Sequence, residues 1–574
     1  MAVREKALAE KIPQPRWWLI LAGLAIVLAG GFLAHSIRTA DGTTVRDIRF
    51  AGTDGTVMSA LLYVPKNATA QTPAPGILAV HGYINSRETQ DGFAIEFARR
   101  GYVVLALDQT GHGYSGGAAF SNGFGGPDGL RYLRSLPMVD TAQIGLEGHS
   151  MGGWTVLAAA ASMPDGYMAM VLEGSSTGAP YAMEGSPTWP RNLALVFSRY
   201  DEFSKLMWGV DRARDVVASK KLQAVFGSGA PILENRLYGG IAQGTARKLY
   251  QPSTTHPGDH LSIHAIGDAT DWFAATLKGG TPRPPSDQIW YWKEAGTGVG
   301  LVGFVMILLG AFDVLVRLPL FAAVRAPAIP ATVQRDRSWW RAFALNTGLP
   351  ALLFFPTFIA AFVLLPASKW LPQAVTTQIT LWAVVGAVMT LIVARLMQRP
   401  ADAQQSDWAK SILLAVATVT AGYASLWLVD RLFHTDFRLW VVAVKLPSVR
   451  HWAIAAIYVI PLTLAFLVTT RSLASTTVRS DSIRRRYLAG ILTLTCGFIV
   501  MLSVIYGVLF TTGTLITAFD PLSTVIALQF VPVLAAVAII ATFTWQRTGS
   551  YRTGGLIAGL LVTLYAVAGT ATQI

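Results

Sequence analysis

The strongest constraint in this sequence is a series of long apolar runs, each close to the roughly 20 residues that an α-helix needs to cross a bilayer. Apolar residues make up 52% of the 574-residue chain and charged residues only 14%, a composition that excludes a disordered protein. The sequence therefore predicts an integral membrane protein. The nine expected spans are 17–37, 296–316, 343–365, 376–395, 411–430, 452–470, 488–511, 523–545 and 554–573.

The first apolar run has two possible interpretations, a retained anchor and a cleaved signal peptide. The run is longer than the core of a signal peptide, and the small-residue site near Ala34-His35-Ser36 is a poor cleavage site. We therefore expect a transmembrane anchor at 17–37 that follows a cytoplasmic segment, 1–16. Trp290, Tyr291 and Trp292 are expected to precede the second span as an aromatic belt.

Basic residues are unevenly distributed along the chain. Residues 1–295 hold 26 Lys and Arg against 25 Asp and Glu, whereas residues 296–574 hold 20 against 8. The basic clusters of the second part alternate with membrane-length runs, so membrane topology explains them better than nucleic-acid binding, which requires a basic stripe on a folded surface. We therefore expect no nucleic-acid partner.

The orientation in the membrane follows from the loop charges. With the N-terminus inside, the inner segments carry 19 Lys and Arg against 11 outside, which predicts an inner N-terminus and an outer C-terminus in the cell membrane. A domain at 38–295 would then lie on the outer side, and 296–574 would form a bundle of about eight helices. The basic outer loop is an exception, and we expect its stretch Phe437–Leu446 to lie along the interface as an amphipathic segment.

Short apolar strands and helices alternate along residues 43–278, which indicates a mainly parallel sheet with helices on both faces. Thr44–Phe50 and Val57–Val64 predict an opening hairpin with Asp54-Gly55 near its turn. Further strands are predicted at Gly76–His81, Gly101–Asp108, Gln143–Glu147, Met168–Glu173, Leu193–Phe197 and Lys248–Gln251.

The motif Gly148-His149-Ser150-Met151-Gly152 stands between the strand Gln143–Glu147 and a predicted helix. This is the context of a nucleophile elbow, a tight turn that holds a serine hydroxyl above the edge of a sheet. Gly148 and Gly152 suit the turn because side chains there would collide with the neighbouring strands and helix. The alternative interpretation is a glycine-rich strand–helix turn with an ordinary N-cap serine.

Two further blocks accompany the elbow: His81-Gly82 at a strand end, and Asp108-Gln109-Thr110-Gly111-His112-Gly113-Tyr114-Ser115-Gly116. The order and spacing of the three blocks resemble the α/β-hydrolase family, and within it the serine aminopeptidase and monoglyceride-lipase-like group, over residues 43–278. The resemblance implies an α/β-hydrolase domain that acts without a cofactor. It also implies an oxyanion hole built from the backbone N–H groups of Tyr83 and Met151.

A serine nucleophile needs a base and an orienting carboxylate, and in this fold the acid precedes the histidine in the chain. Asp201, in the loop after the strand Leu193–Phe197, is the preferred acid. The preferred base is His256, in the loop after the last strand. The sequence leaves alternatives open, namely Glu202 or Glu173 for the acid and His260 for the base.

Other site chemistries have weaker support. The single cysteine, Cys496, excludes an intrachain disulfide and a cysteine-based metal cluster. A metal site at His256, Asp259 and His260 would lack further expected ligands, so no metal is predicted.

The insert before the acid is short. In many relatives a helical cap precedes the acid, but here 27 residues separate Glu173 from Asp201 and Ser175–Trp189 is predicted to be a loop. We therefore expect a membrane-facing opening, with a small-molecule or lipid-like ester as substrate and membrane lipid as a partner. The predicted function is that of a membrane-anchored serine hydrolase that cleaves carboxylic esters through a Ser-His-Asp triad and an acyl-enzyme.

Two alternatives remain. One is a serine peptidase or aminopeptidase, because relatives on this fold cleave both bond types. The other is a transporter or assembly protein with a non-catalytic hydrolase domain, which an intramembrane charge would favour, and Asp313 is the best candidate for such a charge. Neither the oligomeric state nor the identity of the ester follows from the sequence.

Overall fold

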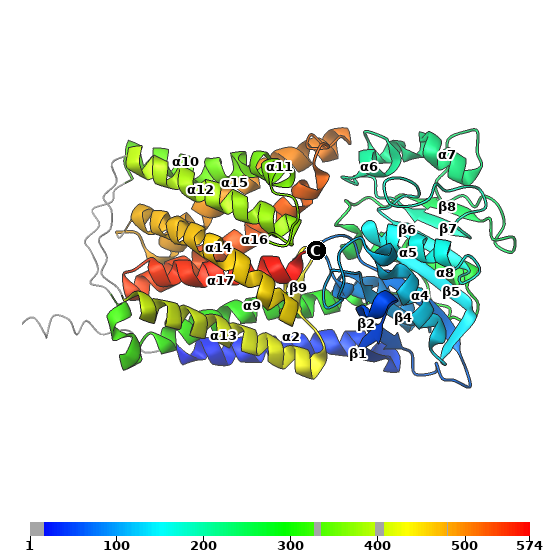
Figure 1. The fold of residues 1–574 in the computed structure, drawn as a ribbon, viewed down its shortest axis with the longest axis horizontal. Helices are drawn as coiled ribbons and strands as arrows, with labels where there is room; N and C mark the ends of the chain where they lie inside the picture. Colours follow the sequence, from blue (N-terminus) through cyan, green and yellow to red (C-terminus); the bar gives the residue numbers. More distant parts are fainter. Residues whose placement is uncertain (1–15, 326–334, 397–406, 479) are drawn as a thin grey trace, which may run out of the picture.

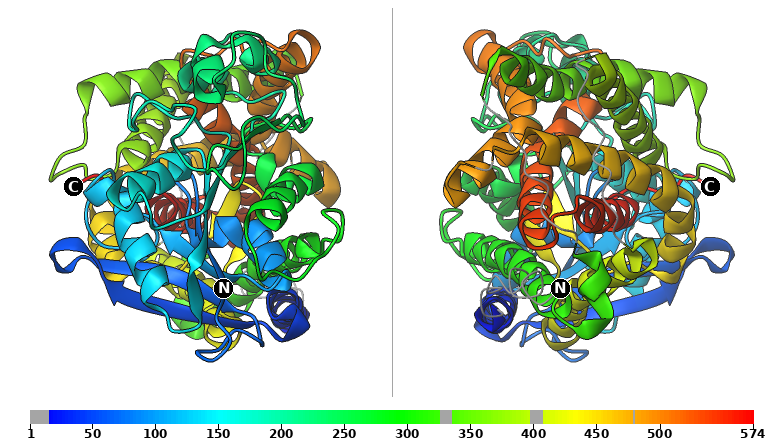
Figure 2. Two further views of the ribbon diagram at one scale, coloured as in Figure 1. Left: turned by 90° about the vertical axis from the view of Figure 1, so that its right-hand side faces the viewer. Right: turned by 90° about the vertical axis from the view of Figure 1, so that its left-hand side faces the viewer.

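The computed structural model describes residues 16–325, 335–396 and 407–574, apart from residue 479. The expected cytoplasmic segment 1–16 lies outside the described residues except for Arg16. The molecule is elongated, with an α/β domain at one end and a bundle of long helices at the other (Figure 1). Seen along the long axis, the bundle lies behind the domain in the left view of Figure 2 and in front of it in the right view.

The α/β domain is built on an eight-stranded sheet with the order β1-β2-β4-β3-β5-β6-β7-β8. The pairs β1–β2 and β2–β4 are antiparallel and all other neighbours are parallel, which confirms the predicted hairpin and mainly parallel sheet. The strands are β1 (Thr44–Ala51), β2 (Val57–Val64), β3 (Ala74–Val80), β4 (Val103–Asp108), β5 (Val139–His149), β6 (Ala169–Glu173), β7 (Leu193–Val196) and β8 (Arg247–Tyr250).

Helices cover both faces of the sheet because side chains alternate along each strand. Ile77 of β3 packs into an apolar cluster with α3 (Asp91–Arg99) and α8 (Ile263–Thr276). Its neighbour Leu78 packs on the opposite face with α4 (Gly126–Ser135) and α5 (Met151–Ser162).

Residues 175–189 contain neither helix nor strand, as expected. A helical insert instead lies between β7 and β8, where it forms α6 (Ser204–Trp208) and α7 (Lys220–Phe226). The sequence analysis did not predict these two short helices. Both lie at the edge of the domain, and α6 is the nearer of the two to the bundle (Figure 1).

Nine helical segments in the described part of the chain are long and apolar enough to cross a membrane, and each overlaps an expected span. The second begins at Trp290, so the aromatic residues 290–292 belong to the helix instead of preceding it. The helices are α2 (Trp17–Arg38), α9 (Trp290–Leu315), α10 (Arg337–Leu352) with α11 (Phe354–Leu364), α12 (Ala374–Leu396), α13 (Trp408–Phe433), α14 (Val449–Thr476), α15 (Ile483–Thr512), α16 (Pro521–Thr548) and α17 (Arg552–Gly569).

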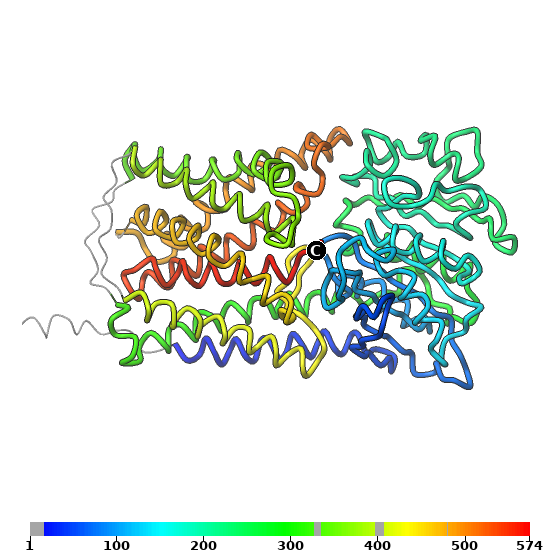
Figure 3. The backbone as a smooth tube through the Cα atoms, viewed as in Figure 1, coloured from blue at the N-terminus to red at the C-terminus, as the bar shows by residue number. Residues whose placement is uncertain are grey.

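The domain is joined to the bundle by α2 and α9, which enter and leave it side by side (Figure 3). Small residues allow this close packing. A Cβ atom at Gly30 would lie 2.4 Å from the carbonyl oxygen of Gly296, and one at Gly303 would lie 2.9 Å from that of Gly23. Close backbone approach through small residues is typical of helix pairs in membranes.

The stretch Phe437–Leu446 forms a hairpin of β9 (Phe437–Leu439) and β10 (Val442–Val444) between bundle and domain, so the prediction of an interfacial amphipathic segment is wrong. Its basic side chains are buried. Arg438 pairs with Asp436 at 2.9 Å and donates to the Ser86 hydroxyl at 3.1 Å, and Lys445 pairs with Glu88 at 3.1 Å. The charges face the domain and its carboxylates instead of lipid headgroups.

Candidate active site

Ser150 lies in a strained turn between β5 and α5, with φ 55° and ψ −121°. Such a conformation is rare for a residue with a side chain and persists only where the surroundings enforce it. A Cβ atom at Gly148 would lie 2.2 Å from the Gly152 carbonyl oxygen, and one at Gly152 would lie 2.1 Å from that of Val80. Both positions therefore admit only glycine, and the packing of the turn against β3 explains the motif.

The hydrogen bonds of Ser150 to the described residues involve its backbone and not its hydroxyl. Its residue is 9% exposed, and its backbone N–H donates to the Glu173 carbonyl oxygen at 2.8 Å. None of the described residues forms a hydrogen bond with the hydroxyl. The hydroxyl thus stands at the N-terminus of α5, where the helix dipole favours developing negative charge.

His256 and Asp201 meet in the loops that follow β8 and β7. The imidazole Nδ1 lies 2.8 Å from Asp201 Oδ2, and Asp201 Oδ1 accepts the Phe203 N–H at 2.7 Å. A Cβ atom at Gly174, whose φ is +50°, would lie 2.7 Å from the same Nδ1, so this position must be glycine to admit the ring. With Nδ1–H donated to Asp201, Nε2 carries the lone pair that a base needs.

Burial determines the charge state of this histidine. It lowers the pKa of His256 to about 4, against the opposing effect of Asp259. The ring is therefore neutral at pH 7 and able to accept a proton. The backbone on either side of the ring is also fixed, because His256 N–H donates to Glu202 Oε2 at 2.8 Å and the His256 carbonyl lies 2.9 Å from His149 Nε2.

The alternative residues of the sequence analysis occupy different places. Glu202 contacts the main chain of His256 and not its ring, and burial next to Asp201 raises the pKa of Glu202 to about 8. Glu173 is buried, and neither carboxylate oxygen has a hydrogen-bond partner among the described residues. The His260 ring packs against His149 at 4.2 Å between centroids, with both nitrogens unpartnered in the described structure.

The two expected oxyanion donors flank the serine. Met151 begins α5, where a backbone N–H has no acceptor within the helix, and Tyr83 follows the loop at the end of β3. Neither N–H is hydrogen-bonded to a described residue. A Cβ atom at Gly82 would lie 3.1 Å from Ser150 Cβ, so the Tyr83 loop runs directly beside the serine.

The second motif block braces these loops. Asp108 accepts hydrogen bonds from the Ser59 hydroxyl at 2.8 Å, from Arg87 N–H at 2.9 Å and from Tyr114 N–H at 3.0 Å. Gly113, with φ +52°, is required because a Cβ atom there would lie 2.2 Å from an Asp108 oxygen. Within the described ranges, no group of three or more His, Cys, Asp and Glu residues is arranged to hold a metal ion.

Sequence reasoning missed the contacts that the bundle makes with the site. Tyr506 of α15 donates to Glu202 Oε1 at 2.8 Å, Trp440 of the β9–β10 hairpin donates to the Pro257 carbonyl at 2.8 Å, and Gln573 donates to the Tyr83 hydroxyl at 2.6 Å. No local motif marks these residues. The edge of the sheet that carries Ser150 and His256 therefore faces the helical bundle.

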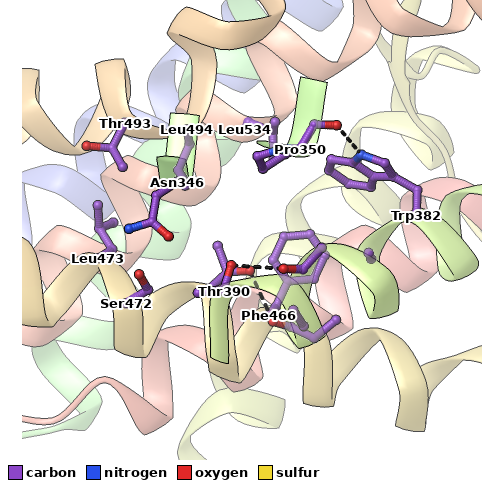
Figure 4. A pocket seen from close by; sticks show the side chains of 15 residues that line it. Asn346, Pro350, Trp382, Thr390, Phe466, Ser472, Leu473, Thr493, Leu494 and Leu534 are labelled. Carbon is purple, nitrogen blue, oxygen red and sulfur yellow. Dashed lines mark hydrogen bonds between the residues drawn. The ribbon is translucent and has the colours of Figure 1, made fainter. Parts of the chain in front are cut away.

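A separate cavity of about 50 Å³ lies inside the bundle, between α10, α12, α14, α15 and α16. Its polar groups are uncharged, and Asn346 points toward Ser472 in the close-up (Figure 4). None of its lining residues belongs to the α/β domain. Asp313, the expected intramembrane charge, lies elsewhere and pairs with Arg547 and Arg317.

Comparison with known proteins finds similarity within the α/β domain. Residues 71–206 match the family model described as serine aminopeptidase, S33. The monoacylglycerol lipase of Mycolicibacterium smegmatis is 31% identical over 142 residues, which cover 23% of this chain and 46% of that protein. Mycobacterium phage D29 has a protein that carries a non-heme haloperoxidase name. It is 33% identical over 112 residues, which cover 19% of this chain and 39% of the phage protein.

A solved structure is also similar over part of the domain. The α/β hydrolase GrgF from Penicillium sp. sh18 is 25% identical and aligns over 24% of this chain and 49% of its own, with a TM-score of 0.21. This chain thus covers less than half the length of each of these relatives. The domain is an α/β hydrolase, as predicted. Residues 71–206 are similar to the S33 serine aminopeptidase model, and the domain that contains them is joined to a many-helix apolar region.

Proposed function

We propose that this protein is a membrane-anchored serine hydrolase that cleaves carboxylic esters, with lipid-like esters as the preferred class. Ser150 is the proposed nucleophile, His256 the base and Asp201 the acid that orients it. The observation that carries the proposal is the 2.8 Å contact between His256 Nδ1 and Asp201 Oδ2 beside a strained serine elbow. The family of the domain supports hydrolysis as the reaction class.

In the proposed reaction, His256 Nε2 takes the proton of the Ser150 hydroxyl while the oxygen attacks the ester carbonyl. The backbone N–H groups of Tyr83 and Met151 hold the resulting oxyanion, and each such donor is worth about 10²–10³ in rate. His256 then protonates the leaving alcohol, which leaves an acyl-enzyme on Ser150. Attack by water, with the same base, releases the acid and restores the serine.

Lipid-like esters are favoured by the position of the site. The edge of the sheet with Ser150 faces helices of membrane-spanning length, and Leu522 and Val525 of α16 pack against the apolar core around Met151. The relative from Mycolicibacterium smegmatis carries the name monoacylglycerol lipase, which is the same substrate class. A site at the membrane end of the domain is accessible to a substrate whose acyl chain remains in the bilayer.

An active-site-directed fluorophosphonate probe tests the nucleophile. We expect it to label the purified full-length protein but not Ser150→Ala, and this substitution should lower kcat on the order of 10⁶-fold. Labelling of neither protein would reject the enzymatic proposal and favour a non-catalytic hydrolase domain.

A substrate comparison tests the bond and the substrate class. The protein in detergent micelles and in vesicles is given a short soluble ester, a membrane-dispersed monoacylglycerol and an aminoacyl amide. We expect hydrolysis of both esters, with the higher kcat/KM for the dispersed one. Cleavage of the amide alone would favour a peptidase, and cleavage of short esters but never of dispersed ones would reject lipid-like substrates.

A further inference from the structure

The end of α15 that points toward the domain holds the loop of the catalytic acid from two sides. The ring of Tyr200 lies 5.1 Å from that of Phe510 in an edge-on contact, and both Tyr200 and Tyr506 pack on a small apolar cluster of Ile505, Leu509 and Leu515. Tyr200 directly precedes Asp201 and Glu202. A helix of membrane-spanning length thus contacts the residues on either side of the proposed acid, Tyr200 and Glu202.

A continuous hydrogen-bonded path leads from this helix to the proposed base. The Tyr506 hydroxyl donates to Glu202 Oε1 at 2.8 Å, and Glu202 Oε2 accepts the backbone N–H of His256 at 2.8 Å. Glu202 is 2% exposed, so both of its hydrogen bonds are shielded from water. The next peptide group is fixed as well, because Trp440 donates to the Pro257 carbonyl oxygen.

We propose that Tyr506 is a positioning residue which, acting through Glu202, holds the backbone of His256 in the register that its ring needs to reach Ser150, so that catalysis depends on docking of the helical bundle against the hydrolase domain. This inference rests on the proposed serine-hydrolase function. It assigns the bundle a part in the active site beyond anchoring. It also gives Glu202 a role different from that of Asp201, since it orients the main chain and not the imidazole.

The physical reason is the sensitivity of general-base catalysis to small displacements of the base. A base acts only within hydrogen-bond reach of the proton it abstracts, about 2.6–3.2 Å between heavy atoms. Without the tyrosine hydroxyl, Glu202 keeps a buried oxygen without a partner and is free to rotate away from the His256 N–H. The loop can then move the ring while substrate binding, which uses other residues, remains.

The first test is Tyr506→Phe in the full-length protein, since this change removes only the hydroxyl. We expect kcat to fall about tenfold, as for loss of one buried hydrogen bond, with KM changed less than twofold. The rate constant for fluorophosphonate labelling of Ser150 should fall by the same factor. Tyr487→Phe is the matched control, on the same helix but about 28 Å from Tyr506 at 1.5 Å per residue, and should leave both rates unchanged.

The second test distinguishes action through Glu202 from a general structural effect. Glu202→Gln should also lower kcat about tenfold, because the amide NH₂ cannot accept from either donor and both contacts persist only if the Tyr506 hydroxyl turns from donor to acceptor. The double variant Tyr506→Phe, Glu202→Gln should lose no more than Glu202→Gln alone, within about twofold, since coupled residues are not additive. An additive loss of about 100-fold would overturn the inference.

The failure of this inference is distinguishable from failure of the proposed function. If the probe does not label wild type, the hydrolase proposal fails. If wild type is labelled and Tyr506→Phe is labelled at the wild-type rate, only the role of Tyr506 is refuted. If Tyr506→Phe lowers the thermal midpoint, its loss of kcat could come from partial unfolding. The kcat of Glu202→Gln, a change in the domain, then tests the same hydrogen-bonded path. An unchanged kcat in Glu202→Gln refutes the inference.

Discussion

Replacing Asp201 by Asn tests the proposed site most directly, because three buried carboxylates compete for the role of the acid. Asp201 Oδ2 accepts from His256 Nδ1 at 2.8 Å, while Oδ1 accepts the Phe203 N–H at 2.7 Å. An amide has a single acceptor oxygen, so Asp201→Asn must turn its NH₂ group toward one of these two donors. The Phe203 N–H can only donate, whereas the imidazole can change tautomer, so we expect the NH₂ group to face the imidazole. The imidazole then keeps its proton on Nε2, where Ser150 requires a lone pair.

The expected loss follows from this tautomer change. An equivalent substitution that keeps the geometry but selects the wrong tautomer lowers kcat about 10⁴-fold, which corresponds to about 5.4 kcal/mol at 1.36 kcal/mol per factor of ten. Glu202→Gln should lose about tenfold, since Glu202 holds only the His256 backbone. Glu173→Gln should change kcat less than threefold, because its carboxylate contacts no group of the triad.

The measurement is steady-state hydrolysis of a short soluble ester by the three variants in the same detergent. Thermal midpoints show whether each variant is folded, and the labelling rate of Ser150 separates acylation from later steps. A larger loss in Glu202→Gln or Glu173→Gln than in Asp201→Asn would refute the assignment of the acid and the geometric reasoning behind it.

Three further outcomes are expected. Burial lowers the pKa of His256 to about 4, and Asp201, Asp259 and Glu202 are the acidic groups close to it. We therefore expect kcat/KM for an uncharged ester to fall to half its plateau value near pH 4. A fall to half near pH 6.5 would contradict this prediction. Asp91→Asn leaves the buried Arg38 and Lys293 without their shared carboxylate. It should lower the free energy of unfolding by about 3–5 kcal/mol, measured by denaturant titration. An unchanged denaturant midpoint would show that this ion pair is dispensable. Burial raises the pKa of Glu147 to about 8, so this group makes stability fall as pH rises from about 4.5 to about 8, and Glu147→Gln should raise the thermal midpoint at pH 8 more than at pH 5. A thermal midpoint of Glu147→Gln below that of the wild type at pH 8 would contradict this prediction.

Features with a local cause were predictable from the sequence. Each membrane-length helix contains a continuous apolar run, and most strands of the sheet are short apolar segments between turn residues. The elbow was predictable for the same reason, because Gly148 and Gly152 are required by backbone atoms within the turn and the adjoining strand. The order of the eight strands was not predicted, because no single segment determines which strands become neighbours.

Choices between neighbouring residues were not predictable. Asp201 and Glu202 are adjacent carboxylates, and only the course of the loop turns the first toward the His256 ring and the second toward its backbone. The same holds for His260, four residues after His256, whose ring turns to Phe93 and His149. Sequence spacing limits the candidates to a few residues, and the loop conformation decides among them.

Contacts between the two parts of the chain have no sequence signature. Tyr506 and Glu202 are 304 positions apart, so no periodicity connects them. The prediction for the basic loop at 431–450 was wrong because a charge rule for membrane loops considers lipid and water as the only surroundings. Here Glu88 of the domain neutralises Lys445, and a folded neighbour takes the place of the interface.

The position of the site explains why the short insert before Asp201 is compatible with a lipid-like substrate. Moving an acyl chain of about 16 methylene groups from bilayer to water costs on the order of 13 kcal/mol, at about 0.8 kcal/mol per group. A soluble hydrolase must offset that with an apolar cap of its own. The bundle contacts the domain at the edge of the sheet that carries Ser150. Under the proposed function, only the ester group of a lipid-like substrate would then have to leave the bilayer to reach Ser150, and the contacts that join the bundle to the domain would also bring the substrate within reach of the serine.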